Sequence, residues 1–95
     1  ALNDGYDMQM CDVIREFFFK ADVITPNTTE LAILANKGNF DVLNENWVND
    51  YSNIEKSLNM LYKKGLSKIV VTGYKENGAI SIIILYNGEI SIVTN

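Results

Sequence analysis

Residues 21–34 read ADVITPNTTELAIL and combine the end of a strand with the start of a helix. Residues 21–25 are rich in apolar and β-branched side chains, which is typical of a short strand. Pro26 ends that strand because proline has no N–H to donate to a sheet. Residues 28–36 predict a helix whose inward face carries Leu31, Leu34 and Ala35. A strand that turns directly into a helix indicates an α/β protein.

Two interpretations of Asn27 and Glu30 stay open on spacing alone. In the first, Asn27 is the N-cap of the helix and Glu30 completes a capping box three residues later. In the second, both side chains lie at the carboxyl end of a strand, where open α/β sheets bind ligands. The helix N-terminus would then bind an anion, and the Glu30 carboxylate would hold Mg²⁺ through water together with the Asn27 amide.

The rest of the chain predicts one domain, residues 1–95, with its elements in the order α, β, α, α, β, β, β. Asp7 can begin the first helix, Lys37 and Gly38 close the second, and Gly65 ends the last. The expected helices are residues 7–20, 28–36 and 50–64, and the expected later strands are residues 68–72, 79–85 and 89–93.

The long, helix-containing connection between the first two strands favours a parallel pair. Asn87-Gly88 predicts an antiparallel hairpin between the last two strands. The expected fold is therefore a mixed sheet with parallel strands flanked by helices, plus an antiparallel hairpin.

Composition removes several classes of function. The chain has no histidine, so it lacks the commonest general base and zinc ligand. Cys11 is the only cysteine, so no internal disulfide can form, which fits a reducing, cytoplasmic location. Cys11 is expected to pack as a small apolar residue. Lys63, Lys64 and Lys68 form one basic cluster at a predicted helix end, where they match the helix dipole rather than mark a nucleic-acid surface. No apolar run is long enough to span a membrane.

The motif TPN–x–x–E in ADVITPNTTEL resembles a segment of the ribokinase-like superfamily, most closely its pyridoxal kinases. SKIVVTGY at residues 67–74 and the hairpin NGAISIIILYNGEISIV at residues 77–93 follow in the same order as in the nucleotide-binding half of those kinases. The resemblance extends over residues 10–93. It implies a partial ribokinase-like fold that belongs to an incomplete domain.

The resemblance also implies a function and a site. These kinases use ATP and Mg²⁺ to phosphorylate the hydroxymethyl group of pyridoxal, pyridoxine or pyridoxamine. By the same likeness, Asn27 and Glu30 would lie near magnesium and phosphate, and Thr72 and Gly73 would contact phosphate. A hydroxymethylpyrimidine, sugar or nucleoside kinase of the same superfamily fits these residues as well.

One departure from the family bears on catalysis. The family's Gly-x-Gly-Asp segment supplies the catalytic base and an anion hole, and the sequence contains no such segment. Phosphoryl transfer depends on positioning and charge stabilisation. We therefore expect the chain to be inactive alone.

A second hypothesis is a non-catalytic α/β module that assembles with another chain. The strands at residues 80–85 and 90–93 are apolar and have poorly protected edges, and such edges associate. This pattern predicts a homodimer.

Overall fold

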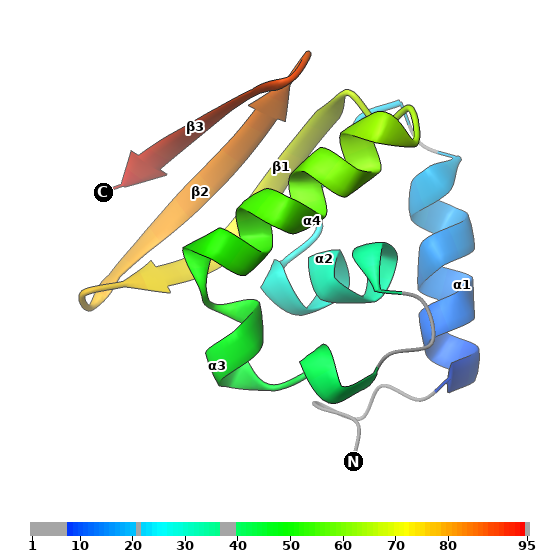
Figure 1. Cartoon of the computed structure of the whole chain (residues 1–95), viewed down its shortest axis with the longest axis horizontal. Coiled ribbons are helices and arrows are strands. Elements are labelled where there is room, and N and C mark those ends of the chain that lie inside the picture. Colours follow the sequence, from blue (N-terminus) through cyan, green and yellow to red (C-terminus); the bar gives the residue numbers. More distant parts are fainter. Residues whose placement is uncertain (1–7, 21, 37–39, 95) are drawn as a thin grey trace.

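The computed structural model describes residues 8–20, 22–36 and 40–94. The elements in chain order are α1 (Met8–Phe19), α2 (Thr28–Ala35), the 3₁₀ turn η2 (Phe40–Val42), α3 (Glu45–Val48), α4 (Tyr51–Lys63), β1 (Lys68–Glu76), β2 (Ala79–Tyr86) and β3 (Glu89–Thr94) (Figure 1). The three long helices agree with the sequence prediction to within two residues at each end. The expected caps at Asp7 and at Lys37-Gly38 lie outside the described residues.

The three strands form an open antiparallel sheet in the order β1-β2-β3. Both connections are two-residue Asn-Gly turns with positive φ at each position: 52° and 80° at Asn77-Gly78, and 50° and 93° at Asn87-Gly88. Positive φ at both central residues is the type I′ turn that suits tight hairpins. The second hairpin was predicted. The first was not, because β1 was expected to end at Thr72 and instead runs to Glu76.

The structure is a small α/β domain, but its named strands include no parallel pair. Residues 21–25 were predicted as a parallel strand. In the described part of that segment and the two residues after it, parallel pairing with β1 is limited to two isolated bridges, Ile24–Ile69 and Asn27–Thr72. The prediction of a mixed sheet with regular parallel strands is therefore corrected to an antiparallel sheet with a short parallel contact along the edge of β1.

Pro26 explains why this contact does not become a strand. Ile24 donates its N–H to Lys68 O (3.2 Å) and accepts from Val70 N–H (2.9 Å), as a parallel ladder requires. The next ladder donor on this segment would be residue 26, and proline has no N–H. Only its carbonyl contributes, by accepting from Thr72 N–H at 3.0 Å.

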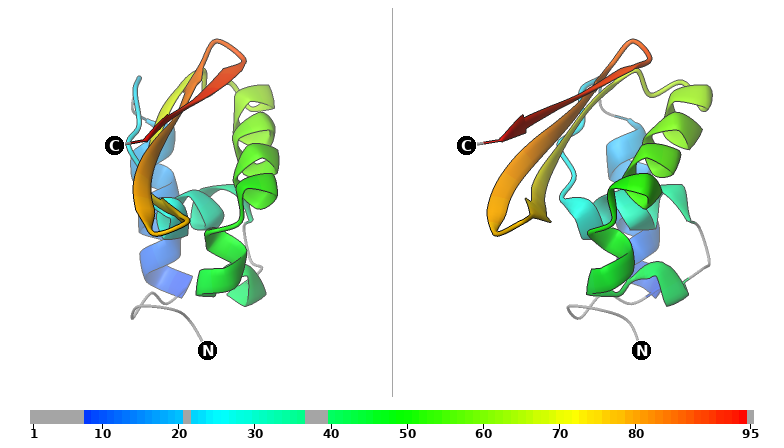
Figure 2. Two further views of the ribbon diagram at one scale, coloured as in Figure 1. Left: turned by 90° about the vertical axis from the view of Figure 1, so that its left-hand side faces the viewer. Right: turned by 60° about the vertical axis from the view of Figure 1, so that its left-hand side comes forward.

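The main core lies between one face of the sheet and the helices α4 and α2 (Figure 2). The inward side chains alternate along β1 and β2, which is the period-two pattern of a sheet covered on one face. The buried residues of this cluster are Ile24, Leu31, Leu34, Ala35, Ile54, Leu58, Leu61, Ile69, Val71, Tyr74, Ile83 and Leu85. On the opposite face Ile80, Ile82 and Val93 remain exposed.

Helix α2 is the centre of the domain, because it contacts α1, α3, α4 and β1. Leu31, Leu34 and Ala35 are buried in the main core, as predicted. Ala32 and Ile33 are buried on the other side, in a second cluster. A helix that is apolar all round is a buried helix, so α2 is packed between two cores. The second cluster comprises Cys11, Ala32, Ile33, Val42, Leu43 and Val48, with Ile14 and Trp47 packed against it.

Helix α1 packs through only part of the face that its spacing predicts, which comprises Met10, Val13, Ile14, Phe17 and Phe18. Ile14 packs against the second cluster and Phe18 against the main core, as predicted, whereas Met10, Val13 and Phe17 are exposed. The buried residue is Cys11, which confirms its expected role as a small apolar residue. Arg15 fixes the helix by donating to the carbonyl oxygens of Ile33 and Leu34 at the end of α2.

None of the helices in residues 8–20, 22–36 and 40–94 has the length and apolar content needed to cross a lipid bilayer.

Candidate functional site

The start of α2 is a complete capping box. Asn27 has an extended backbone, and its Oδ1 accepts the Glu30 backbone N–H at 2.8 Å. In return, Glu30 Oε1 accepts the Asn27 backbone N–H at 2.9 Å. The two side chains satisfy donors that the first turn of a helix would otherwise leave without a partner. The first of the two interpretations of these residues is thus confirmed, and Asn27 Oδ1 and Glu30 Oε1 each accept one hydrogen bond within the cap.

The four residues predicted from the kinase resemblance lie at one edge of β1. Asn27 forms a parallel bridge with Thr72, and Glu30 is bonded to Asn27. Gly73 follows Thr72 directly. The structure therefore brings Asn27, Glu30, Thr72 and Gly73 together, although they come from segments more than 40 residues apart in the chain.

Thr72 and Gly73 form a β-bulge. Val71 pairs with Ile83 and Tyr74 with Ser81, so two residues of β1 lie opposite the single residue Ile82. Gly73 has a φ of +77°, a conformation that glycine adopts without steric cost. A Cβ built on Gly73 would meet no atom within 4 Å, so the space beside its backbone is open to a ligand.

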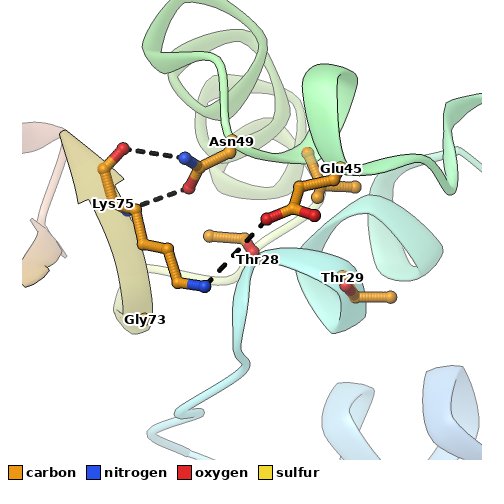
Figure 3. A pocket seen from close by; sticks show the side chains of 7 residues that line it. Thr28, Thr29, Glu45, Asn49, Gly73 and Lys75 are labelled. Atoms are coloured by element: carbon orange, nitrogen blue, oxygen red, sulfur yellow. Dashed lines mark hydrogen bonds and ion pairs between the residues drawn. The ribbon is translucent and has the colours of Figure 1, made fainter. Parts of the chain in front are cut away.

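Asn49 holds β1 where it leaves the bulge. Its Nδ2 donates to Lys75 O at 2.7 Å, and its Oδ1 accepts from Lys75 N–H at 2.9 Å (Figure 3). The side-chain amide thus makes the two backbone hydrogen bonds that a neighbouring strand would otherwise make at this position. Asn49 comes from the end of α3, so the two bonds also tie α3 to the sheet.

A cavity of about 290 Å³ opens between the bulge, α3 and the first turn of α2. Its lining residues are Thr28, Thr29, Glu45, Val48, Asn49, Gly73 and Lys75. Lys75 Nζ approaches Glu45 Oε1 to 4.0 Å across this space (Figure 3). Both side chains are exposed, and an exposed ion pair at this distance contributes little stability. Lys75 can therefore turn toward a ligand at small cost.

Sequence reasoning identified part of this arrangement. Gly73 lines the cavity, whereas Asn27, Glu30 and Thr72 lie beside it without lining it. From the sequence alone, Lys75 would be expected in a connection after Gly73 and Glu45 in a polar loop, so neither residue was predicted to line a site. No local sequence pattern pointed to Asn49, because the residue it contacts, Lys75, lies 26 positions further along the chain.

The residues fit a phosphate group better than a fully protein-bound metal. No group of three or more histidine, cysteine or acidic side chains that could hold a metal ion occurs among the described residues. Mg²⁺ usually keeps several waters and binds through one or two carboxylates plus phosphate oxygens. Glu30 retains its second carboxylate oxygen, Oε2, outside the capping box, which suits a water-mediated contact with Mg²⁺. The first turn of α2 and Lys75 provide positive potential for an anion.

Tyr74 lies on the core side of the same bulge. Burial raises the pKa of its hydroxyl above the ordinary value of 10.0, and the hydrogen bond to the Glu76 side chain and the charges of Glu76 and Asp50 raise it further. Its ring packs near that of Tyr51 on α4, with centroids 6.2 Å apart. Tyr74 is thus neutral at physiological pH and anchors the strand beyond the bulge.

Comparisons with models of protein families, with curated proteins and with solved structures found no match for this chain. Its function is therefore argued from the geometry of the site and from the resemblance in the sequence.

Proposed function

We propose that this chain forms the phosphate-binding side of the nucleotide site in an ATP-dependent kinase of the ribokinase-like type. The substrate would be the hydroxymethyl group of pyridoxal, pyridoxine or pyridoxamine. The observation that carries the proposal is the bridge between Asn27 and Thr72. That bridge puts the TPN–x–x–E segment and the Thr-Gly bulge at the two sides of one polar cavity.

Each part of the cavity has a task in binding phosphate. The helix α2 presents its N-terminal turn, where the helix dipole favours negative charge. Gly73 leaves room for a phosphate to approach the backbone, since no side chain stands there. Lys75 leaves its weak pairing with Glu45 and neutralises one phosphate charge.

ATP supplies the transferable phosphoryl group, and Mg²⁺ neutralises the charge on its phosphates. Glu30 would hold a magnesium-bound water through Oε2, while Oε1 stays in the capping box. The sequence contains no Gly-x-Gly-Asp segment to accept the substrate proton. We therefore expect this chain alone to bind Mg-ATP without transferring phosphate.

Nuclear magnetic resonance of the ¹⁵N-labelled chain with Mg-ATP tests the proposal. We expect the largest shift changes at the amides of Thr28, Thr29, Gly73 and Lys75. Replacing Lys75 with Gln should weaken binding by about threefold, the effect of losing roughly 0.7 kcal/mol from one exposed charge contact. The fold should persist, because Asn49 bonds to the backbone of Lys75 rather than to its side chain.

Lys68→Gln is the matched control, since Lys68 is an exposed lysine at the opposite end of the same strand. It should bind Mg-ATP as the unmodified chain does. Shifts that gather away from the cavity, or equal weakening by Lys68→Gln and Lys75→Gln, would remove the support for a nucleotide site here.

A further inference from the structure

The two edges of the sheet are protected very differently. The edge of β1 is covered along its length. Ile24 and Pro26 bond to its first half, and the Asn49 side chain bonds to Lys75 in its second half. A proline, a bulge and a lysine are devices that keep an edge strand from pairing with another chain. This edge of the sheet is closed.

The edge of β3 has none of these devices. Within the described residues, β3 pairs only with β2. Its sequence from Ile90 to Thr94 is uncharged and mostly β-branched, and it contains no proline. Such a strand pairs readily with another one.

The hairpin register shows which backbone groups are open. Tyr86 and Glu89 flank a two-residue turn, so they form a hydrogen-bonded pair, and bonded pairs then recur at every second residue. The backbone groups of Ser91 and Val93 therefore point toward β2. Those of Ile90, Ile92 and Thr94 point to the open edge, where they present three N–H donors and three C=O acceptors.

We propose that β3 pairs with β3 of a second copy of this chain, antiparallel about a two-fold axis at Ile92. In this register Ile92 faces Ile92 of the other copy, and Ile90 faces Thr94. All six open groups of each copy then find partners, which gives six hydrogen bonds across the axis. The inference does not depend on the nucleotide proposal, because the site lies at the far edge of the sheet.

The side chains favour a second copy as the occupant. On the core side of the sheet the facing residues, Ile90, Ile92 and Thr94, are all β-branched, and β-branched cross-strand pairs stabilise antiparallel sheets. The only charge on β3 is Glu89. In this register the two Glu89 residues lie about 20 Å apart by strand geometry, beyond the range of unscreened repulsion at physiological salt.

Pairing through β3 is also expected to end at a dimer. In the part of the chain that the structure describes, each copy offers one open edge, and its other edge is covered by residues 24–27 and by Asn49. Association through β3 therefore stops at two copies and gives one continuous six-stranded sheet. A single strand contact is small, so we expect a reversible dimer rather than an obligate one.

Sedimentation equilibrium of the whole chain from about 5 µM to 1 mM, a range that covers weak association, tests the proposal. We expect a monomer–dimer equilibrium. Ile92→Lys should weaken it at least tenfold, because it puts two like charges directly opposite each other at the axis. The matched control is Val93→Lys. Val93 is 53% exposed against 43% for Ile92, but its side chain lies on the other face, opposite Ser91 of the second copy, so association should change less than twofold.

Amide hydrogen exchange of the unmodified chain gives a second, mutation-free measurement. Exchange at Ile90, Ile92 and Thr94 should slow as concentration rises, while exchange at residues of α4 should not change. Three results would overturn the proposal: a monomer throughout, species larger than a dimer, or a dimer that both lysine variants weaken equally. Concentration-independent exchange at the three β3 amides would do so even if Ile92→Lys failed to fold.

Discussion

Glu30 has one role that the structure shows and one that we propose, and a pair of substitutions can separate them. One role is structural, because Oε1 accepts the Asn27 N–H. The other is the proposed water-mediated contact of its carboxylate with Mg²⁺. Glu30→Ala removes both the hydrogen bond and the charge. Glu30→Gln removes only the charge, since glutamine is the other residue that completes a capping box.

The expected effects on stability follow from these bonds. Loss of a capping interaction costs about 1 kcal/mol, and the better helix propensity of alanine offsets a few tenths of that. Glu30→Ala should therefore lower the free energy of unfolding by about 0.5–1 kcal/mol, a urea midpoint shift of about 0.5 M. Glu30→Gln keeps the bond and loses only the favourable interaction with the helix dipole, about 0.3 kcal/mol.

The expected effects on ligand binding follow the charge instead. Titration calorimetry with Mg-ATP should find both variants weakened by a similar factor, about threefold, because both lack the carboxylate. Stability and binding thus rank the variants differently. In its free energy of unfolding, Glu30→Gln should be close to the unmodified chain. In its affinity for Mg-ATP, it should be close to Glu30→Ala.

Two results would refute this reasoning. If Glu30→Gln binds Mg-ATP as tightly as the unmodified chain, the carboxylate has no part in holding magnesium and Glu30 is only a cap. If Glu30→Gln is destabilised as much as Glu30→Ala, the hydrogen bond to Asn27 does not account for the stability of this helix start.

Two further predictions concern the strand beyond the bulge. Asn49→Ala should lower the free energy of unfolding by about 1–2 kcal/mol, because two hydrogen bonds to Lys75 are lost. Urea unfolding measures this change. The control is Asn46→Ala, at an exposed asparagine nearby, which should change the free energy of unfolding by less than about 0.5 kcal/mol. The raised pKa of Tyr74 means that the folded state holds its proton more tightly than the unfolded state. The stability contributed by the protonated hydroxyl is therefore full below pH 10 and is lost as pH rises above it, and Tyr74→Phe should abolish this part of the pH dependence.

Local signals in the sequence predicted the parts of the fold that depend on neighbouring residues. The capping box at Asn27 and Glu30 spans four residues, and the Asn87-Gly88 hairpin spans two. Asn77-Gly78 carries the same signal and forms the same turn, so the β1–β2 hairpin was also accessible. It was missed because Thr72-Gly73 was interpreted as the end of a strand, whereas it is a bulge inside one.

The remaining differences depend on contacts between distant residues. Spacing identified α1 as a helix but could not decide which residues of its apolar face pack. Met10, Val13 and Phe17 are exposed, although they are as regularly spaced as Ile14 and Phe18, which pack against the two cores. The deciding contacts come from α2, where Arg15 reaches two carbonyl groups. Likewise, only the folded chain brings Asn49 and Lys75 together to form one wall of the cavity.

The capping box also limits what Asn27 can do in the proposed nucleotide site. Its Oδ1 accepts the Glu30 N–H, so only the second lone pair of that oxygen is left for a metal, and the cap fixes its direction. The side-chain Nδ2 then carries two hydrogens, and an amide nitrogen donates to phosphate rather than binding a cation. Asn27 is thus suited to contact a phosphate oxygen, and Glu30 keeps an oxygen outside the cap, Oε2, that is suited to Mg²⁺. Asn27→Asp tests this division: aspartate still caps the helix, but it has no N–H to donate and adds a negative charge, so the cap should persist while Mg-ATP binding weakens.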